Sequence, residues 1–253
     1  MNKVVVSLYD FTGEAVRPWA EAGYTCLCLD IQHPTGGGSI DPGDYYPETG
    51  GAIWKIHWNR EWLPSDTVDM IKHKAGGKPI VMGFAFPVCT DLASSGARHW
   101  AIKAERDPHF QKKAAVYAIE ASLIMDDLDC PWMIENPNGA LTSWWRKWDY
   151  SFDPCQYGGY LPEGPHPRWP DYIPERDAYT KRTNLWTSDD FVMPEPKPVE
   201  PIKISITKRD GTVTSGSPQW AKLGGKSAKT KNIRSATPRG FARAVFEAHT
   251  AED

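Results

Sequence analysis

The chain has 253 residues, of which 40% are apolar and 24% charged, enough for one large domain or one domain with a small appendage. These ordinary fractions exclude a fibrous or disordered protein. The 12 Trp and 22 Pro are high contents and predict long, structured, aromatic-rich loops. No apolar run reaches the length of a membrane span, and Met1 to Lys3 leads straight into Val4 without a signal peptide. We therefore expect a cytosolic protein.

The formal net charge of −3 is unevenly distributed. Between Ile202 and Arg234 the only acid is Asp210, and the bases there are Lys203, Lys208, Arg209, Lys222, Lys226, Lys229, Lys231 and Arg234. A local excess of positive charge is expected where phosphates are contacted. A solvated basic loop is the alternative.

The cysteines are odd in number and scattered along the chain, at Cys26, Cys28, Cys89, Cys130 and Cys155. This pattern argues against a disulfide framework. Cys26 and Cys28 could form half of a metal site, but no second Cys/His pair stands at zinc spacing. We expect structural cysteines on a strand there, and no metal.

The N-terminal third predicts a βαβ opening and a long loop. Residues 3–8 predict a strand and residues 14–22 a helix. Residues 24–30 predict a second strand, apolar on both faces as buried parallel strands are. Residues 31–66 are rich in Gly, Pro and Trp and predict a loop whose length suggests function. A brief helix is expected at residues 67–74.

Two later strands end in polar, Pro-marked turns. The strand at 80–86 is followed by Cys89, and the strand at 131–134 is followed by Glu135. Between them, residues 108–127 carry apolar side chains at helical spacing and should pack on the sheet. The ends of such strands are where a parallel α/β sheet exposes reactive side chains.

The composition changes after Tyr150. Residues 191–201 carry repeated prolines and predict an extended linker. Residues 202–206 and 212–214, joined through Asp210 and a glycine, predict a β-hairpin. Residues 238–248 predict a closing helix.

The segments Phe84–Asp91 and Trp132–Pro137, in this order behind a strand-turn-helix, resemble the DNA cytosine-5 methyltransferases, and in particular compact, phage-type members. The resemblance covers nearly the whole chain and implies the cytoplasm of a bacterial or phage-infected host cell. It implies an α/β, Rossmann-like S-adenosylmethionine-dependent methyltransferase fold. The expected catalytic domain is 1–150, the small inserted target-recognition region is 151–232, and the segment 233–253 completes the catalytic domain.

In this family a Pro-Cys turn supplies a nucleophile and a Glu-Asn turn an acid. Cytosine C5 is a poor nucleophile, so a thiolate adds to C6 while an acid protonates N3. The resemblance gives these roles to Cys89 and Glu135, and gives Arg182 the task of holding the base or the adduct. The alternatives are a buried apolar cysteine, a first-turn acid and a surface salt bridge, respectively.

The resemblance also implies a donor site around the turn after the first strand, with Tyr9 near the adenine and Asp30 on the ribose hydroxyls. The expected donor-binding residues are Tyr9, Asp10, Phe11, Thr12, Gly13, Asp30, Ile31, Pro87, Ser235 and Thr237. The Gln-x-Arg-x-Arg element of the family is not found intact, and residues 156–159 and 179–186 resemble its split counterpart. Two turn positions also depart from the family pattern. Phe11 replaces the first glycine of the turn, although Gly13 is retained, and Val88 replaces the proline before the nucleophile.

Residues 90–100 resemble the mobile loop that closes on DNA in the family, and residues 234–244 its closing motif. Because a base within a duplex is out of reach, the target must be flipped out or single-stranded. We expect a monomer that binds DNA through Arg98, His99, Lys203, Lys208, Arg209, Lys222 and Lys226.

Two alternatives remain open. Arg234 and Arg239 beside the expected donor site, with the altered turn at Phe11, would suit a carboxylated donor or an RNA substrate. A catalytically degenerate, DNA-binding homologue would explain Val88 and Phe11 as signs of lost turnover.

Overall fold

The computed structural model describes residues 3–59, 61–207, 211–223, 225 and 227–251. The chain divides into two compact units. The first comprises the chain up to Ser151 together with Thr183–Phe191, and the second comprises Phe152–Arg182 and the chain from Val192 onward. None of the helices among these described residues is long and apolar enough to cross a membrane.

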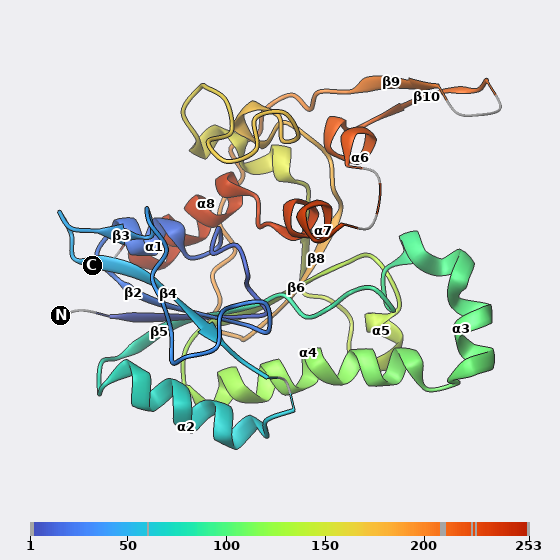
Figure 1. Ribbon diagram of the computed structural model, residues 1–253. Helices are drawn as coiled ribbons and strands as arrows, with labels where there is room; N and C mark the ends of the chain where they lie inside the picture. The colour runs from blue at the N-terminus through green and yellow to red at the C-terminus, as the bar shows by residue number, and fades with distance from the viewer. Residues whose placement is uncertain (1–2, 60, 208–210, 224, 226, 252–253) are drawn as a thin grey trace. The chain divides into compact units, whose positions relative to one another are not determined.

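The first unit is built on a mostly parallel sheet (Figure 1) with the strand order β3-β4-β2-β1-β5-β6-β8-β7. Five neighbouring strands are parallel, namely β4 (Gly51–His57), β2 (Thr25–Asp30), β1 (Val4–Leu8), β5 (Ile80–Ala85) and β6 (Trp132–Pro137). Two outer strands, β3 (Tyr45–Tyr46) and β8 (Thr183–Thr187), run antiparallel to their neighbours, and β7 (Tyr150–Phe152) ends the sheet. The predicted α/β, Rossmann-like fold, with a mostly parallel central sheet, is confirmed.

Helices cover both faces of this sheet. The short helix α1 (Arg17–Glu21) lies on one face, and α2 (Pro64–Ala75) and α4 (Phe110–Asp127) lie on the other (Figure 1). The predicted apolar stripe of α4 is buried at Ala114, Ala118 and Ala121. Between β5 and α4 the chain forms the 3-10 helix η1 (Ser94–His99) and the helix α3 (Trp100–Arg106), and α5 (Leu141–Trp144) follows β6.

Several elements differ from the prediction. The expected loop at 31–66 contains β4, which was missed because Lys55 interrupts its apolar run. In the structure Lys55 is 3% exposed, and its Nζ lies 3.5 Å from an Asp44 carboxylate oxygen, so its charge is compensated inside the sheet. The helix expected to start at residue 14 starts at Arg17, and the segment expected as a loop at 90–100 is largely helical.

The second unit is rich in short elements: η2 (Pro154–Tyr160), η3 (Glu175–Asp177), β9 (Ile204–Thr207), β10 (Val213–Gly216), α6 (Pro218–Lys222), α7 (Ala228–Ser235) and α8 (Arg239–Thr250). The predicted hairpin and closing helix are confirmed as β9-β10 and α8. The expected turn residue Asp210 lies outside the described residues. The aromatic rings of Phe152 and Phe241 stack with centroids 4.0 Å apart, which joins α8 to the start of this unit.

The predicted Pro-rich linker is extended but packed. Gly159 N–H donates to the Lys197 carbonyl at 2.7 Å, and Val199 N–H donates to the Cys155 carbonyl at 2.8 Å. A Cβ at Gly158 would lie 2.4 Å from Val199 Cγ2. The glycines of η2 therefore let the extended segment lie directly on that helix, and the segment is not a free spacer.

Candidate active site

The strand register brings the predicted catalytic segments to one edge of the sheet. Leu8 of β1 is aligned with Leu29 of β2 and with Ala85 of β5, and Ala85 is aligned with Ile134 of β6. The residues that follow these positions therefore lie at or just beyond the carboxyl edge of the parallel strands, where α/β proteins bind ligands. These residues are the turn from Tyr9, Asp30, the Pro87–Cys89 segment and Glu135.

Cys89 differs from the other cysteines in its exposure. All five cysteines are described, and Cys89 is the one that is not buried. Burial raises the pKa of Cys130 to about 12 and raises the pKa values of Cys26 and Cys28 well above the usual range. Because thiolates are the nucleophilic form, these buried thiols are poor nucleophiles.

The turn that carries Cys89 is closed by its own backbone. The Cys89 carbonyl accepts hydrogen bonds from the N–H groups of Leu92 at 3.0 Å and Ala93 at 2.8 Å. Pro87 is buried, whereas Val88 is 47% exposed. Val88 is thus exposed at the position where the resemblance predicts a proline.

Glu135 lies inside β6, not after it as predicted, and is half-buried. The next residue, Asn136, is fully buried, and its Nδ2 donates to the Pro87 carbonyl at 3.0 Å. This bond joins the strand of Glu135 to the turn of Cys89. The Asn136 Oδ1 has no hydrogen-bond partner within the described part of the chain.

A second connection joins the same two segments. Ala93 and Gly139 form an antiparallel bridge, flanked by hydrogen bonds from Ser94 N–H to the Asn138 carbonyl at 2.9 Å and from Ala140 N–H to the Leu92 carbonyl at 2.8 Å. A Cβ at Gly139 would lie 1.9 Å from the Leu92 oxygen. Only glycine allows this approach, so Gly139 is a site residue that the sequence reasoning missed.

The turn after β1 is shaped by Asp10. Its buried carboxylate accepts hydrogen bonds from the Ser7 hydroxyl at 2.8 Å, the Gly13 N–H at 2.7 Å and the Thr12 hydroxyl at 3.3 Å. Gly13 has a φ of +71°, and a Cβ there would lie 2.9 Å from Lys55 Nζ. The retained glycine is thus required by both backbone conformation and space.

The side chain of Phe11 is partly exposed at the turn after β1. Its ring is 37% exposed and stacks on His33, with centroids 5.5 Å apart and an interplanar angle of 21°. His33 donates from Nε2 to the Asp10 carbonyl at 3.0 Å, and burial lowers the pKa of His33. Tyr9, by contrast, is half-buried and packs its ring against Trp58, with centroids 4.8 Å apart. The exposed aromatic ring at this turn is therefore that of Phe11.

Asp30 ends β2 and is 8% exposed. One of its oxygens accepts a hydrogen bond from the Gln32 N–H at 2.8 Å, and burial raises the pKa of Asp30. The neighbouring Ile31 is 57% exposed. Asp30 and Ile31 thus offer a carboxylate and an apolar surface at the same edge as Phe11.

A cluster of largely buried charged side chains contacts the turn after β1. Asp44 lies 3.1 Å from the Arg17 guanidinium and 3.5 Å from Lys55 Nζ, and Lys55 also donates to the Phe11 carbonyl at 3.3 Å. The sequence reasoning missed this cluster. A lysine within the apolar run at 51–57 was the signal that could have indicated it.

The residues expected to contact phosphate differ in their surroundings. Arg98 and His99 are exposed on η1, and the Arg98 Nε donates to His99 Nε2 at 3.1 Å. In the second unit Lys203 is exposed, and Lys222 Nζ donates to the Asp171 carbonyl at 2.9 Å. The remaining expected residues, Lys208, Arg209 and Lys226, lie outside the described residues.

The other site residues predicted in the second unit are near its surface. Arg182 is exposed and lies 3.6 Å from an Asp153 carboxylate oxygen. The Ser235 hydroxyl donates to the Asn232 carbonyl at 3.2 Å at the end of α7, and Thr237 is half-buried. Their roles stay predictions.

No family model matches the chain, and no curated protein matches it. One similar solved structure, from E. coli, is described as a "putative DNA modification methyltransferase encoded within prophage", with 13% sequence identity and a TM-score of 0.41. The match covers 95% of this chain and 66% of that one, so this chain spans just under two thirds of its length.

Proposed function

We propose that the protein methylates C5 of cytosine in DNA, using S-adenosylmethionine and a covalent bond between Cys89 Sγ and cytosine C6. The observation that carries the proposal is the double connection between the Cys89 and Glu135 segments. Asn136 bonds to the Pro87 carbonyl at 3.0 Å, and Gly139 bridges to Ala93. Such fixed geometry is what a two-group attack on one ring needs.

The two groups would act on opposite ends of the same conjugated system. Addition of the Cys89 thiolate to C6 makes C5 nucleophilic, while a proton held by Glu135 at N3 neutralises the charge that develops on the ring. C5 would then take the methyl group as the bond from that group to the donor sulfur breaks. Loss of the C5 proton to water and departure of the Cys89 thiolate would restore the aromatic base. The target base has to leave the helix to reach both groups.

The edge residues of β1 and β2 fit the donor. The exposed ring of Phe11 and the carboxylate of Asp30 lie at the same edge of the sheet. Aromatic surface suits a purine, and a carboxylate suits ribose hydroxyls. S-adenosylmethionine, when bound, supplies an electrophilic methyl group. Asp10 is committed to the turn and would act by shaping it.

Transfer of tritium from labelled S-adenosylmethionine to DNA tests the proposal. Cys89→Ser should abolish transfer and prevent trapping of an adduct on 5-fluorocytosine DNA, whereas Cys155→Ser should do neither. Glu135→Gln should slow turnover by about 10²- to 10⁴-fold while donor binding stays normal. An adduct that survives Cys89→Ser would refute the assignment. Mass spectrometry of nucleosides from treated DNA and RNA would identify a different donor group or an RNA substrate.

A further inference from the structure

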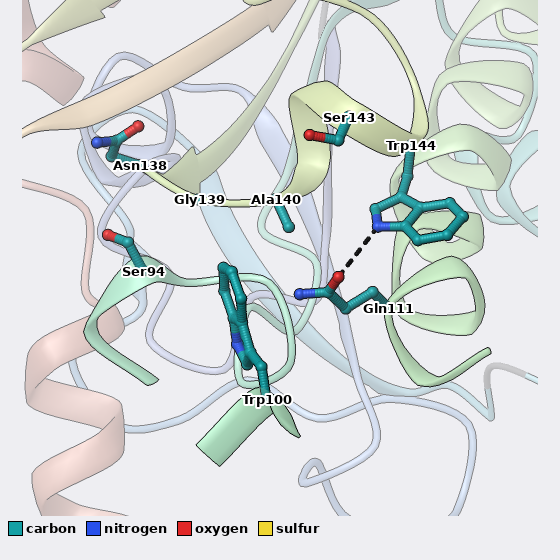
Figure 2. A pocket seen from close by; sticks show the side chains of 8 residues that line it. All are labelled: Ser94, Trp100, Gln111, Asn138, Gly139, Ala140, Ser143 and Trp144. Carbon is teal, nitrogen blue, oxygen red and sulfur yellow. Dashed lines mark hydrogen bonds between the residues drawn. The ribbon is translucent and has the colours of Figure 1, made fainter. Parts of the chain in front are cut away.

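The first unit contains a cavity that the catalytic proposal does not use. Its volume is about 490 Å³, within the range of small-molecule sites. It is formed by η1, the first residues of α3 and α4, the turn after β6 and α5, and is lined by Ser94, Trp100, Gln111, Asn138, Gly139, Ala140, Ser143 and Trp144 (Figure 2). Neither Cys89 nor Glu135 lines it, so it is distinct from the site expected for the target cytosine.

The cavity shares its frame with the catalytic segments. Its lining residues Ser94 and Asn138 are joined by the backbone hydrogen bond of 2.9 Å, and Gly139 forms the bridge to Ala93. The chain that leaves Cys89 therefore forms one wall, and the chain that leaves Glu135 forms another. A ligand in the cavity would therefore contact two segments that begin only a few positions after Cys89 and Glu135 in the sequence.

One side of the cavity is aromatic and held in place. The Trp144 indole N–H donates to Gln111 Oε1 at 3.2 Å, and Gln111 Nε2 donates to the Asp91 carbonyl at 3.3 Å. The Trp144 ring is nevertheless 41% exposed, and the ring of Trp100 projects into the same space (Figure 2). A fixed, accessible indole is a stacking surface for a planar ring.

The opposite side is polar and uncharged. Ser94 and Asn138 lie across the cavity from Trp144 and Gln111 (Figure 2). The side chains of Asn138, Ser94 and Ser143 make no hydrogen bonds within the part of the chain that the structure describes, so their donors and acceptors are available to a ligand. Among the described residues, those that line the cavity carry no charge, which disfavours a phosphate or a carboxylate as its occupant. Exposed Arg98, on η1 beside the cavity, could hold a phosphate outside it.

We propose that this cavity binds an unpaired nucleobase of the DNA substrate other than the target cytosine. A neutral, planar ring with a polar edge matches an aromatic wall faced by an amide and hydroxyls. The inference rests on the proposed function, because extruding a target base leaves its partner and neighbours without their normal stacking. Occupation of the cavity would hold the two catalytic segments against the DNA.

Binding of a fluorescent oligonucleotide that contains one cytosine target, measured by anisotropy, tests this site separately from turnover. Trp144→Ala should weaken binding by about 5- to 150-fold, the range expected for one lost base-stacking contact. Trp144→Phe keeps a stacking ring and should bind like the wild type. Trp54→Ala is the matched control, because Trp54 is 39% exposed on β4 and does not line the cavity.

A series of oligonucleotides with one abasic position each locates the base. Removal of the base at one position other than the target should weaken binding by the wild type. The same removal should not weaken binding by Trp144→Ala any further. If no such position exists for the wild type, or if Trp144→Ala binds like Trp54→Ala, the cavity proposal is wrong. The wild-type series decides this even if Trp144→Ala fails to fold.

Tritium transfer measured on the same samples separates the two proposals. If methyl transfer occurs and Trp144→Ala binds the oligonucleotide as tightly as the wild type, only the cavity proposal is refuted. Oligonucleotide binding that depends on Trp144, without any methyl transfer, refutes the proposed function and supports the cavity as a base site. Absence of oligonucleotide binding by the wild type refutes both.

Discussion

Asn136 is predicted to control turnover through the position of the Cys89 turn. Its Nδ2 donates to the Pro87 carbonyl at 3.0 Å in a fully buried site. Asn136→Ala removes the donor and leaves that carbonyl without its partner, which costs about 1–3 kcal/mol in the free energy of unfolding. For a chain of this size the melting temperature should fall by roughly 2–12 °C.

The larger effect is expected on kcat. A displacement of a reacting group by about 1 Å can reduce the rate about 10²-fold, and the lost bond frees the turn to move by such an amount. Affinity for DNA should stay unchanged, because Asn136 is buried and cannot contact a ligand phosphate. The measurements are thermal unfolding, single-turnover methyl transfer and oligonucleotide anisotropy.

A matched control separates lost stability from lost geometry. Thr67 is fully buried, and its hydroxyl oxygen accepts a hydrogen bond from the Trp58 indole N–H at 3.1 Å. Thr67→Val removes this hydrogen bond and the one that the hydroxyl donates to the Leu63 carbonyl at 3.3 Å, both outside the Cys89 turn, and should lower stability without lowering kcat. If Asn136→Ala reduces kcat no more than Thr67→Val does, the reasoning about the connection is refuted.

Asn136→Asp adds a test that depends on pH. A buried carboxyl has a raised pKa, and its protonated form can donate to the Pro87 carbonyl as the amide does. Its ionised form places a negative charge against that carbonyl. Activity of Asn136→Asp relative to the wild type should therefore rise as the pH falls, and a ratio independent of pH would contradict the proposed bond.

Three further predictions concern other parts of the chain. In Gly139→Ala the new Cβ would lie 1.9 Å from the Leu92 oxygen, so this variant should destabilise the first unit by at least about 2 kcal/mol in thermal unfolding. Gly96→Ala is the control, because its Cβ would have its nearest contact at 3.6 Å, and it should be nearly neutral. His166 is 5% exposed, and burial lowers its pKa from 6.5 to about 4, so the unfolded state binds a proton that the folded state does not. The free energy of unfolding should therefore fall by up to about 3 kcal/mol as the pH drops from 6.5 to about 4. His166→Asn keeps a hydrogen-bond acceptor, and its denaturant titrations should lack that fall. If Lys203 contacts a phosphate, Lys203→Ala should reduce the slope of log affinity against log salt by about one, and an unchanged slope would exclude the contact.

The parts of the fold that could be predicted depend on local pattern. Strands β1, β2 and β5 are apolar on both faces, and α4 carries its apolar residues at helical spacing, so neighbouring residues alone indicate each element. The placement of Cys89 and Glu135 at one sheet edge also followed, because parallel strands end together. These predictions needed no knowledge of distant contacts.

The parts that could not be predicted depend on contacts between distant residues. Lys55 is acceptable in β4 only because Asp44 folds back on it, and Asp44 in turn pairs with Arg17, 27 positions away. The bond from Asn136 to Pro87 spans 49 positions. The Pro-rich segment looked like a spacer because its packing on η2 depends on glycines elsewhere in the chain.

The loop that precedes β4 has a consequence for how copies of this protein behave at high concentration. A strand at the border of a sheet offers unpaired backbone groups to a strand of another molecule. Here the chain covers that border itself, since Ser39 bridges to Lys55, the Asp44 carbonyl accepts from the Ile53 N–H at 2.8 Å, and β3 pairs with Gly51 and Ala52. The outermost strand on that side is thus only Tyr45–Tyr46, too short to template a growing intermolecular sheet. Shortening the loop to remove these contacts should expose β4 and promote association between chains.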